Sequence, residues 1–206
     1  MNIEGESQAA PRQRRAYRKR ARAESERATG EAILNAALSA FGSEPFDRVT
    51  LQEIAARSGV TVQTVIRRFG SKEDLFERLV ERESPRVIAS REPDPEAGLP
   101  EALEALLDHY ERDGDAVLNF VAQEHLFEPV RAVVERGRTV HREWVEHHCS
   151  EILSDTRGPA RQQRLYAAIL ITDLSSWKLL RRDLGLERPN VAAVMTELLE
   201  ALKRRN

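Results

Sequence analysis

The chain has 206 residues, of which 41% are hydrophobic and 5% aromatic, which is enough for a packed helical core. It contains no apolar run long enough to cross a bilayer and no apolar signal-peptide core near its start, so we expect a cytoplasmic protein without a membrane partner. Its single cysteine, Cys149, cannot form an internal disulfide, and we expect it to be a structural residue rather than a redox sensor.

The net charge of −2 hides an uneven distribution of charge along the chain. Through Arg82, Lys and Arg number 15 and Asp and Glu 12, whereas the remaining residues hold 17 and 22. We expect residues 1–25 to form a disordered arm, because the basic run within them has no acid and cannot pack. A solvated tail is the alternative to an arm that binds the phosphates of a nucleic acid. The basic residues of this run are Arg12, Arg14, Arg15, Arg18, Lys19, Arg20 and Arg22.

Residues 26–84 are expected to form a small helical domain that contains two short helices joined by a tight turn. The first of the two begins at Thr50, which has capping-box spacing to a glutamate three residues later. Gly59 supplies the backbone freedom for the turn, and Thr61 is the N-cap of the second helix. A further helix begins at Ser71. This helix-turn-helix order is what a protein that reads the major groove of DNA requires.

Much of this domain resembles the DNA-binding domain of the tetracycline-repressor (TetR) family, over roughly residues 28–82. The run from Trp177 to Leu186 is also similar to the C-terminal domain of one large actinobacterial-style subset of that family. One departure is Ile66, which stands where the family usually has a phosphate-binding tyrosine and is followed by two arginines that can take over this contact. The segments that carry the resemblance are residues 32–41 for the first helix, Thr50–Ala56 for the second and Ser58–Thr61 for the turn. Phe69–Asp74 carries it at the end of the helix that follows the turn and the start of the next helix.

The resemblance implies an all-α fold, with an N-terminal three-helix helix-turn-helix domain and a C-terminal helical domain that binds a ligand and dimerises. It implies a ligand-responsive transcriptional regulator, most simply a homodimeric repressor that a small-molecule effector releases from a palindromic operator in double-stranded DNA. Two-fold symmetry suits this function, because palindromic half-sites about one DNA turn apart mirror a protein dyad.

Contacts with DNA are expected from the second of the two short helices, called the recognition helix below, and from the residues around it. Val62, Gln63 and Thr64 lie in its first turn, where side chains approach base edges. Gln63 is best suited to base reading, because its amide can donate to and accept from adenine in a bidentate pair. The alternative for Thr50 and Thr61 is that they serve as helix caps only, and the alternative for Arg67 and Lys72 is that they are solvated surface. The residues assigned to phosphates, as the resemblance implies, are Thr50, Thr61, Arg67, Arg68 and Lys72.

Residues 85–206 are predicted to form a second, wholly helical domain. Pro and Gly residues at 84–85 and 91–98 indicate the end of the preceding helix and a linker. Residues 99–111 and 116–127 form either two helices or one helix broken at Gly114. The later helices are expected over residues 130–153, 160–184 and 190–202, with a loop at 154–159.

The last two long helices carry an apolar stripe that is wider than the core of one small subunit needs. The resemblance implies that these helices pair with their copies across a two-fold axis as a four-helix bundle. Burial in the chain's own core is the alternative, and it accounts for about half of these residues. The residues assigned to the dimer interface are Leu165, Ile169, Leu180, Val191, Val194, Met195, Leu198, Leu199 and Leu202.

An effector pocket is expected among the C-terminal helices, although no motif specifies its ligand. Aromatic and polar residues that share helix faces are the candidates, and ordinary core packing is the alternative for each. Thr172 and Asp173 interrupt an apolar segment, and we expect a buried aspartate there to be paired, with a partner at the dimer interface favoured over a cationic ligand. The candidate ligand-binding residues are Tyr110, Phe120, Gln123, His141, Trp144 and His148.

The sequence carries no constellation typical of an enzyme, so we expect no catalytic residues, no cofactor and no bound metal. His147 and His148 are adjacent and would point about 100° apart on a helix, which prevents them from sharing one metal. There is no HExxH, no CxxC and no phosphate-binding glycine loop. The remaining alternative is an architectural DNA-binding or protein-interaction module without an effector.

Overall fold

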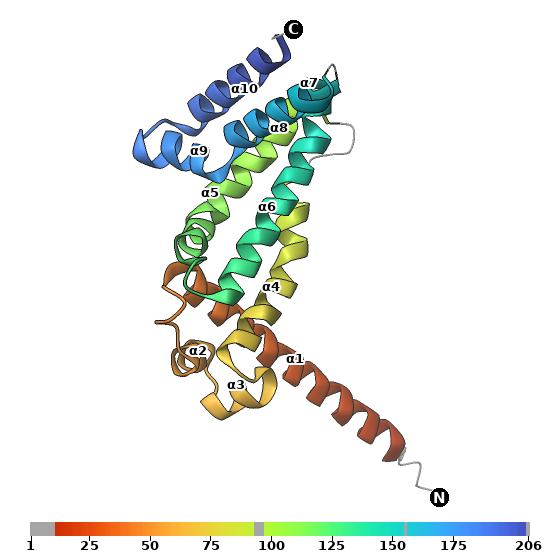
Figure 1. Ribbon diagram of the computed structural model, residues 1–206. Coiled ribbons are helices and arrows are strands. Elements are labelled where there is room, and N and C mark those ends of the chain that lie inside the picture. Colours follow the sequence, from red (N-terminus) through yellow and green to blue (C-terminus); the bar gives the residue numbers. More distant parts are fainter. Residues whose placement is uncertain (1–10, 93–96, 155, 205–206) are drawn as a thin grey trace, which may run out of the picture.

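The computed structural model describes residues 11–92, 97–154 and 156–204, and every secondary-structure element in these ranges is helical, which confirms the all-α prediction (Figure 1). The elements are α1 (Pro11–Ser43), α2 (Leu51–Ser58), α3 (Val62–Phe69), α4 (Lys72–Ala89), α5 (Leu99–Gln123), α6 (Glu128–His148), α7 (Ser150–Ser154), α8 (Gly158–Thr172), α9 (Leu174–Lys178), a π-helical turn (Leu179–Asp183) and α10 (Arg188–Arg204). Figure 1 shows α2 and α3 at one end of the molecule, with α4 running from them towards the C-terminal helices. None of the helices in the described ranges has the length and apolarity that a bilayer span requires.

The first helix begins much earlier than predicted. α1 is helical from Pro11, so residues 11–25 of the expected disordered arm are helical instead, while residues 1–10 lie outside the described residues. The sequence there is rich in Ala, Arg and Glu, which have high helix propensity, and Arg22 pairs with Glu26 one turn later at 3.0 Å. Residues 17–28 are all exposed, and Figure 1 shows this part of α1 projecting away from the other helices.

Phenylalanine rings form the centre of the N-terminal core. The ring of Phe76 on α4 lies 5.0 Å from that of Phe41 on α1 and 5.3 Å from that of Phe46, measured between centroids. The core does not stop at the N-terminal helices, because Phe127 lies 5.2 Å from Phe46, and Val130 of α6 is fully buried in the same cluster. A movement of α6 or α4 would therefore change the side-chain packing beneath the helix-turn-helix.

α4 connects the N-terminal helices to the C-terminal ones. It begins as predicted at Ser71, whose side chain accepts from the backbone N–H of Asp74 at 3.0 Å, while the Asp74 carboxylate accepts from the backbone N–H of Ser71. Pro85 does not end the helix, which continues to Ala89, so the boundary expected between residues 84 and 85 falls inside α4. The link between the two ends of the molecule is therefore one continuous helix rather than a flexible joint.

α5 is a single unbroken helix from Leu99 to Gln123, so both expectations for this segment, two helices or one helix broken at Gly114, are wrong. Gly114 is buried, and a Cβ at this position would lie 2.8 Å from the ring of Trp177. The glycine is therefore explained by close packing of α9 on α5 rather than by a helix break. The Trp177 indole also donates to the Glu111 carboxylate at 3.0 Å, which fixes the ring between the two helices.

Two segments predicted as single helices are broken in the structure. α6 ends at His148, because Cys149 has non-helical backbone angles (φ −95°, ψ 17°), and α7 follows as a separate short helix. The second break is at Asp173, which is extended (φ −65°, ψ 149°) and accepts from the backbone N–H of Ser175 at 2.8 Å. Asp173 is thus the N-cap of α9, which corrects the expectation of a buried, paired carboxylate.

Candidate nucleic-acid interface and ligand cavity

The local structure around the recognition helix follows the predicted capping pattern. Thr50 caps α2 by accepting from the backbone N–H of Glu53 at 3.2 Å, and Thr61 caps α3 by accepting from that of Thr64 at 3.3 Å. Between the two helices, Gly59 adopts a left-handed conformation (φ 71°) that an L side chain rarely takes. Both threonines therefore have a structural role in the free protein, whatever they contact in DNA.

One face of α3 is open to solvent. Val65 is fully buried beneath the helix, whereas Gln63, Ile66 and Arg67 are exposed and share the opposite face through their i, i+3, i+4 spacing. Val62, predicted to approach bases, is partly buried against the N-terminal core instead. The hydroxyl of Thr64 lies 3.0 Å from that of Thr61 and is half-buried.

Ile66 is the residue of this face that sequence reasoning did not assign to base reading. Its side chain is 50% exposed. An apolar side chain on a DNA-facing surface can contact the methyl group of thymine. The sequence signal was available, because Ile66 lies one turn after Gln63 and off the apolar face of the helix.

The basic side chains assigned to phosphates differ in the contacts that they make within the protein. Arg67 is exposed and makes no side-chain hydrogen bond or ion pair within the described ranges. Arg68 packs against α1, since a Cβ at Gly30 would lie 2.8 Å from its Nε. The ammonium of Lys72 donates to the backbone carbonyl of Phe46 at 2.8 Å and lies 4.5 Å from the centroid of the Phe46 ring. Arg67 is thus the basic side chain of this set that is most available to DNA.

A cavity of about 280 Å³ lies between α4, α5, α6 and the start of α9. Three of the candidate ligand-binding residues, Tyr110, Phe120 and His141, line it. Two others do not, because both side chains are engaged elsewhere. Gln123 accepts from the backbone N–H of Phe46, and the Trp144 indole donates to the backbone carbonyl of Arg91 at 3.1 Å.

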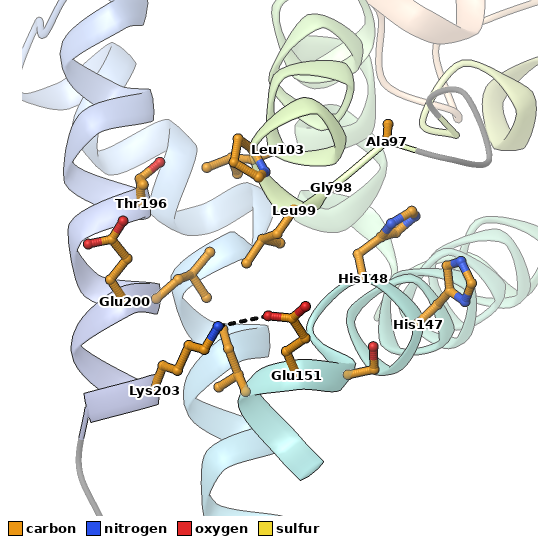
Figure 2. A pocket seen from close by; sticks show the side chains of 14 residues that line it. Ala97, Gly98, Leu99, Leu103, His147, His148, Glu151, Thr196, Glu200 and Lys203 are labelled. Atoms are coloured by element: carbon orange, nitrogen blue, oxygen red, sulfur yellow. Dashed lines mark hydrogen bonds and ion pairs between the residues drawn. The ribbon is translucent and has the colours of Figure 1, made fainter. Parts of the chain in front are cut away.

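The sixth candidate, His148, belongs to a separate hollow of about 490 Å³ at the far end of the C-terminal helices. Figure 2 shows Thr196 and Glu200 of α10 on one side of this hollow and His148 on the other. The ion pair between Lys203 and Glu151, at 2.7 Å, joins α10 to α7 across its floor (Figure 2). The single pocket predicted from the sequence is therefore two separate spaces, and His148 does not share one with His141.

Sequence reasoning also missed the buried ionic residues beside the first cavity. Arg91 is 8% exposed, and its Nη2 lies 2.8 Å from Nε2 of His109, whose Nδ1 lies 3.1 Å from the Asp113 carboxylate. Burial lowers the pKa values of Arg91 and His109. Burial alone would raise the pKa of Asp113, but the bond from His109 and the neighbouring arginines hold it at about 2. Arg91 gave no periodic signal, because it stands in a segment that reads as a linker.

The predicted interface residues divide into covered and free side chains. Leu165, Val191, Met195 and Leu199 are at most 1% exposed within the chain's own core, which corrects their assignment to a surface shared with a partner. Ile169, Leu180 and Leu202 pack partly buried against the same core, and Val194 is also partly buried. Leu198 of α10 remains 48% exposed, and the neighbouring α8 carries two exposed residues that were not predicted, Tyr166 at 58% and Leu170 at 69%.

Cys149 has the structural position that the sequence predicts. Cys149 is fully buried, and burial raises the pKa of its thiol to about 12, so it is a core residue with no thiolate at neutral pH. Within the described ranges, no group of three or more His, Cys, Asp or Glu residues could hold a metal ion.

Comparisons with known proteins find one matching sequence family and several similar structures. Residues 33–79 match the family described as "Bacterial regulatory proteins, tetR family". A tetR-family transcriptional regulator from Streptomyces coelicolor has a similar structure (TM-score 0.64, 19% identity, covering 84% of this chain and 78% of that one). So has a transcriptional regulator of the TerR/AcrR family from Aquifex aeolicus VF5 (TM-score 0.61, 20% identity, covering 84% and 99%). No curated protein sequence matches the chain.

The capped helix-turn-helix, the free face of α3 and the helical C-terminal domain define a DNA-binding transcriptional regulator, a class distinct from enzymes. The family match lies on the helices that form the helix-turn-helix, and the similar structures extend the likeness to the C-terminal helices. Residues 33–79 are thus similar to the tetR family of bacterial regulatory proteins, and the solved structures share the helical fold of the rest of the chain.

Proposed function

We propose that the protein is a homodimeric repressor that binds a palindromic operator in the cytoplasm and is released when a small molecule enters the cavity between α4, α5 and α6. The observation that carries this proposal is the course of α4. Its N-terminal end follows the recognition helix directly, and Glu83, Val87 and Ile88 near its other end line the cavity. One rigid element thus touches both the expected effector and the support of the DNA-reading helix.

The coupling works through two arrangements of α4. A molecule that fills the cavity favours the arrangement in which it fits best, and α4 then shifts the recognition helix relative to its copy in the dimer. The effector can move this equilibrium only by its difference in affinity for the two arrangements. Operator DNA must weaken effector binding by the same factor, because the coupling of two sites is reciprocal.

The dimer is proposed to form through the exposed face of α8 and α10. Tyr166 and Leu170 lie one turn apart on α8, and Leu198 is the exposed leucine of α10. Apolar side chains of this size, more than two-fifths exposed and gathered on neighbouring helices, are typical of an interface. A two-fold axis through this face would give the two copies of α3 the symmetry of a palindromic operator.

DNA binding is proposed to combine base reading with phosphate contacts. Gln63 and Ile66 are assigned to base edges, and Arg67 to a phosphate. The exposed N-terminal part of α1, with its four basic residues from Arg18 to Arg22, is assigned to the DNA backbone as a helical arm rather than a disordered one. Thr50, Thr61 and Lys72 keep a structural role that a phosphate contact can supplement.

Sequencing of genomic fragments bound by the purified protein tests this function directly. The expected result is enrichment of an inverted repeat whose half-sites are separated by about one DNA turn. An architectural module without an effector is the second candidate, and it would enrich fragments without a common inverted repeat. The cavity of about 280 Å³ favours the repressor, because a module that only shapes DNA does not need a small-molecule site between its helices.

A further inference from the structure

The cavity between α4, α5 and α6 is lined by two buried side chains that each carry a polar atom without a partner. Arg91 is 8% exposed and His141 6%, and both line the cavity. Within the described ranges, neither Nε of Arg91 nor Nδ1 of His141 has a hydrogen-bond partner. Buried polar atoms are almost always paired in folded proteins, so two such atoms beside one cavity favour a ligand with polar groups there.

The positive charge of Arg91 is not balanced by direct contact with an acid. Its hydrogen-bond partner is His109, and no carboxylate of the described residues lies within 4.0 Å of its guanidinium. An arginine can only donate, so Nε2 of His109 must accept and the imidazole is neutral, with its proton on Nδ1 facing Asp113. Asp113 is itself held by Arg112 at 3.1 Å. Among the described residues this buried cation is bonded only to a neutral group, which favours an anionic ligand.

His141 lines the same cavity and provides a hydrogen-bond acceptor, in contrast to the cationic donor Arg91. Its Nε2 lies 3.2 Å from the hydroxyl of Thr172, which donates its only proton to the backbone carbonyl of Ala168 at 2.8 Å. Nε2 of His141 therefore carries the ring proton, and Nδ1 is left as an acceptor. Burial lowers the pKa of His141 to about 4, which keeps the ring neutral. The cavity thus offers a cation and a neutral acceptor.

The remaining wall is built mainly from aliphatic and aromatic side chains. Apart from the exposed Arg136, the other charged residues on it are engaged within the protein: Arg86 pairs with Glu83 and Asp113, Arg138 pairs with Glu124, and Asp173 caps α9. Val87 of α4, Val117 and Val121 of α5, Val133 of α6 and Leu174 of α9 contribute to it. Such a surface gains free energy by covering hydrocarbon and discriminates against polar bodies. A molecule that satisfies all of these features has an apolar body and one anionic group.

We propose that the effector is an apolar monocarboxylate whose carboxylate pairs with the guanidinium of Arg91. The inference rests on the proposed function, since it names the chemistry of the molecule that enters the cavity. A carboxylate can accept from Nε and a terminal nitrogen of Arg91 together, which is the geometry that arginine recognises best. It would satisfy Nε and neutralise the guanidinium at the same time.

Isothermal titration of the full-length protein with decanoate and with 2-naphthoate tests this assignment, with the primary amide of each as an uncharged isostere. Each carboxylate is expected to bind at least about tenfold more tightly than its amide. Arg91→Met should abolish that preference. The matched control is Arg136→Met, which removes an exposed arginine from the same cavity wall and should leave the preference intact.

A second measurement guards against misfolding of the variant. Arg91→Met removes a buried charge that lacks a counter-ion, so the free variant should unfold at a temperature no lower than the wild type. Decanoate should raise the unfolding temperature of the wild type and not that of the variant. Three results would overturn the assignment: equal binding of carboxylate and amide, no binding of either carboxylate, or a carboxylate preference that survives Arg91→Met.

The assignment and the proposed function fail in different ways. An amide or an alkylamine that enters the cavity and releases DNA independently of Arg91 would overturn the carboxylate while leaving an effector-released repressor in place. A carboxylate that binds through Arg91 without any change in operator affinity would support the assignment and contradict release by an effector. Operator affinity measured beside each titration separates the two.

Discussion

The side-chain Oε1 of Gln123 accepts a hydrogen bond from the backbone N–H of Phe46 at 2.7 Å, and this bond ties α5 to the turn between α1 and α2. Asn119 lies one turn earlier on α5 and donates to the backbone carbonyls of Phe41 and Glu44 at 3.2 Å and 3.0 Å. Gln123 also donates to the backbone carbonyl of Asn119 at 2.8 Å. This polar joint holds the C-terminal helices to the base of the helix-turn-helix at a point separate from α4.

Loss of this joint should destabilise the protein. Gln123→Met keeps the length of the side chain but leaves the buried N–H of Phe46 without an acceptor, which costs about 1–3 kcal/mol. Chemical denaturation measures the change in the free energy of unfolding. Gln52→Met is the matched control, because Gln52 is exposed on α2, and it should change this free energy by no more than about 0.5 kcal/mol. Equal stability of the two variants would show that the joint is not structural.

Gln63 and Arg67 should have different effects on DNA recognition. Gln63→Ala is expected to cost about 1–3 kcal/mol on the cognate site and to relax the base preference at one position of each half-site. Arg67→Ala should weaken binding to all sequences nearly equally. Selection of binding sites from a randomised pool distinguishes the two effects. A uniform loss of affinity for Gln63→Ala would remove this residue from base reading.

The N-terminal part of α1 should contribute to the dependence of DNA affinity on salt. Deletion of residues 1–22 removes the basic run. The logarithm of the DNA association constant falls by about 0.9 per phosphate contact for each tenfold rise in salt concentration. The deletion should therefore flatten the plot of this logarithm against the logarithm of the salt concentration. Circular dichroism should show the loss of no more helix than the deleted residues held. If the slope on operator DNA is unchanged, this segment does not contact DNA.

The exposed face of α8 and α10 should carry the dimer. Leu170→Glu combined with Leu198→Glu would place charges in an apolar interface, which is too costly without partners, so the variant should sediment as a folded monomer. Operator affinity should fall with it, since a monomer loses the second half-site. The control is Leu126→Glu, at an equally exposed leucine that follows α5. A double variant that remains a tight dimer places the interface elsewhere.

His141 should make the protein less stable in mild acid. Its pKa is lowered by burial to about 4 in the folded state, against about 6.5 when unfolded, so the unfolded chain binds more protons between these values. The free energy of unfolding should therefore fall by up to about 3 kcal/mol as the pH drops from about 6.5 to about 4. His141→Gln should flatten this slope in chemical denaturation. Identical slopes for the variant and the wild type would contradict the buried, neutral state of His141.

The local pattern was predictable where a side chain's role depends on its near neighbours in sequence. Thr50, Thr61 and Ser71 were recognised as caps because a hydroxyl at a helix start accepts from a backbone N–H three residues later, and the structure shows all three bonds. Gly59 was recognised because a tight turn requires a left-handed residue. These interactions need no knowledge of the rest of the fold.

Long-range packing was the part that the sequence could not give. The leucine and valine stripe of α10 has the same periodicity whether it packs on α5 and α8 or on a second subunit, so Met195 and Leu199 could not be separated from Leu198. Gly114 was interpreted as a helix break. In the structure it makes room for the ring of Trp177, which lies 63 residues later in the sequence. Arg91 lies in a segment without periodicity, and only the fold brings it to a cavity.

Hydrogen exchange of the full-length protein with and without operator DNA tests the central claim, that α4 couples the recognition helix to the cavity. DNA binding is expected to change exchange not only in α3 but also in the C-terminal half of α4, residues 83–89, and in the cavity-lining part of α6 around His141. A fragment of unrelated sequence at the same concentration is the control. Changes confined to α1, α2 and α3 would contradict the coupling.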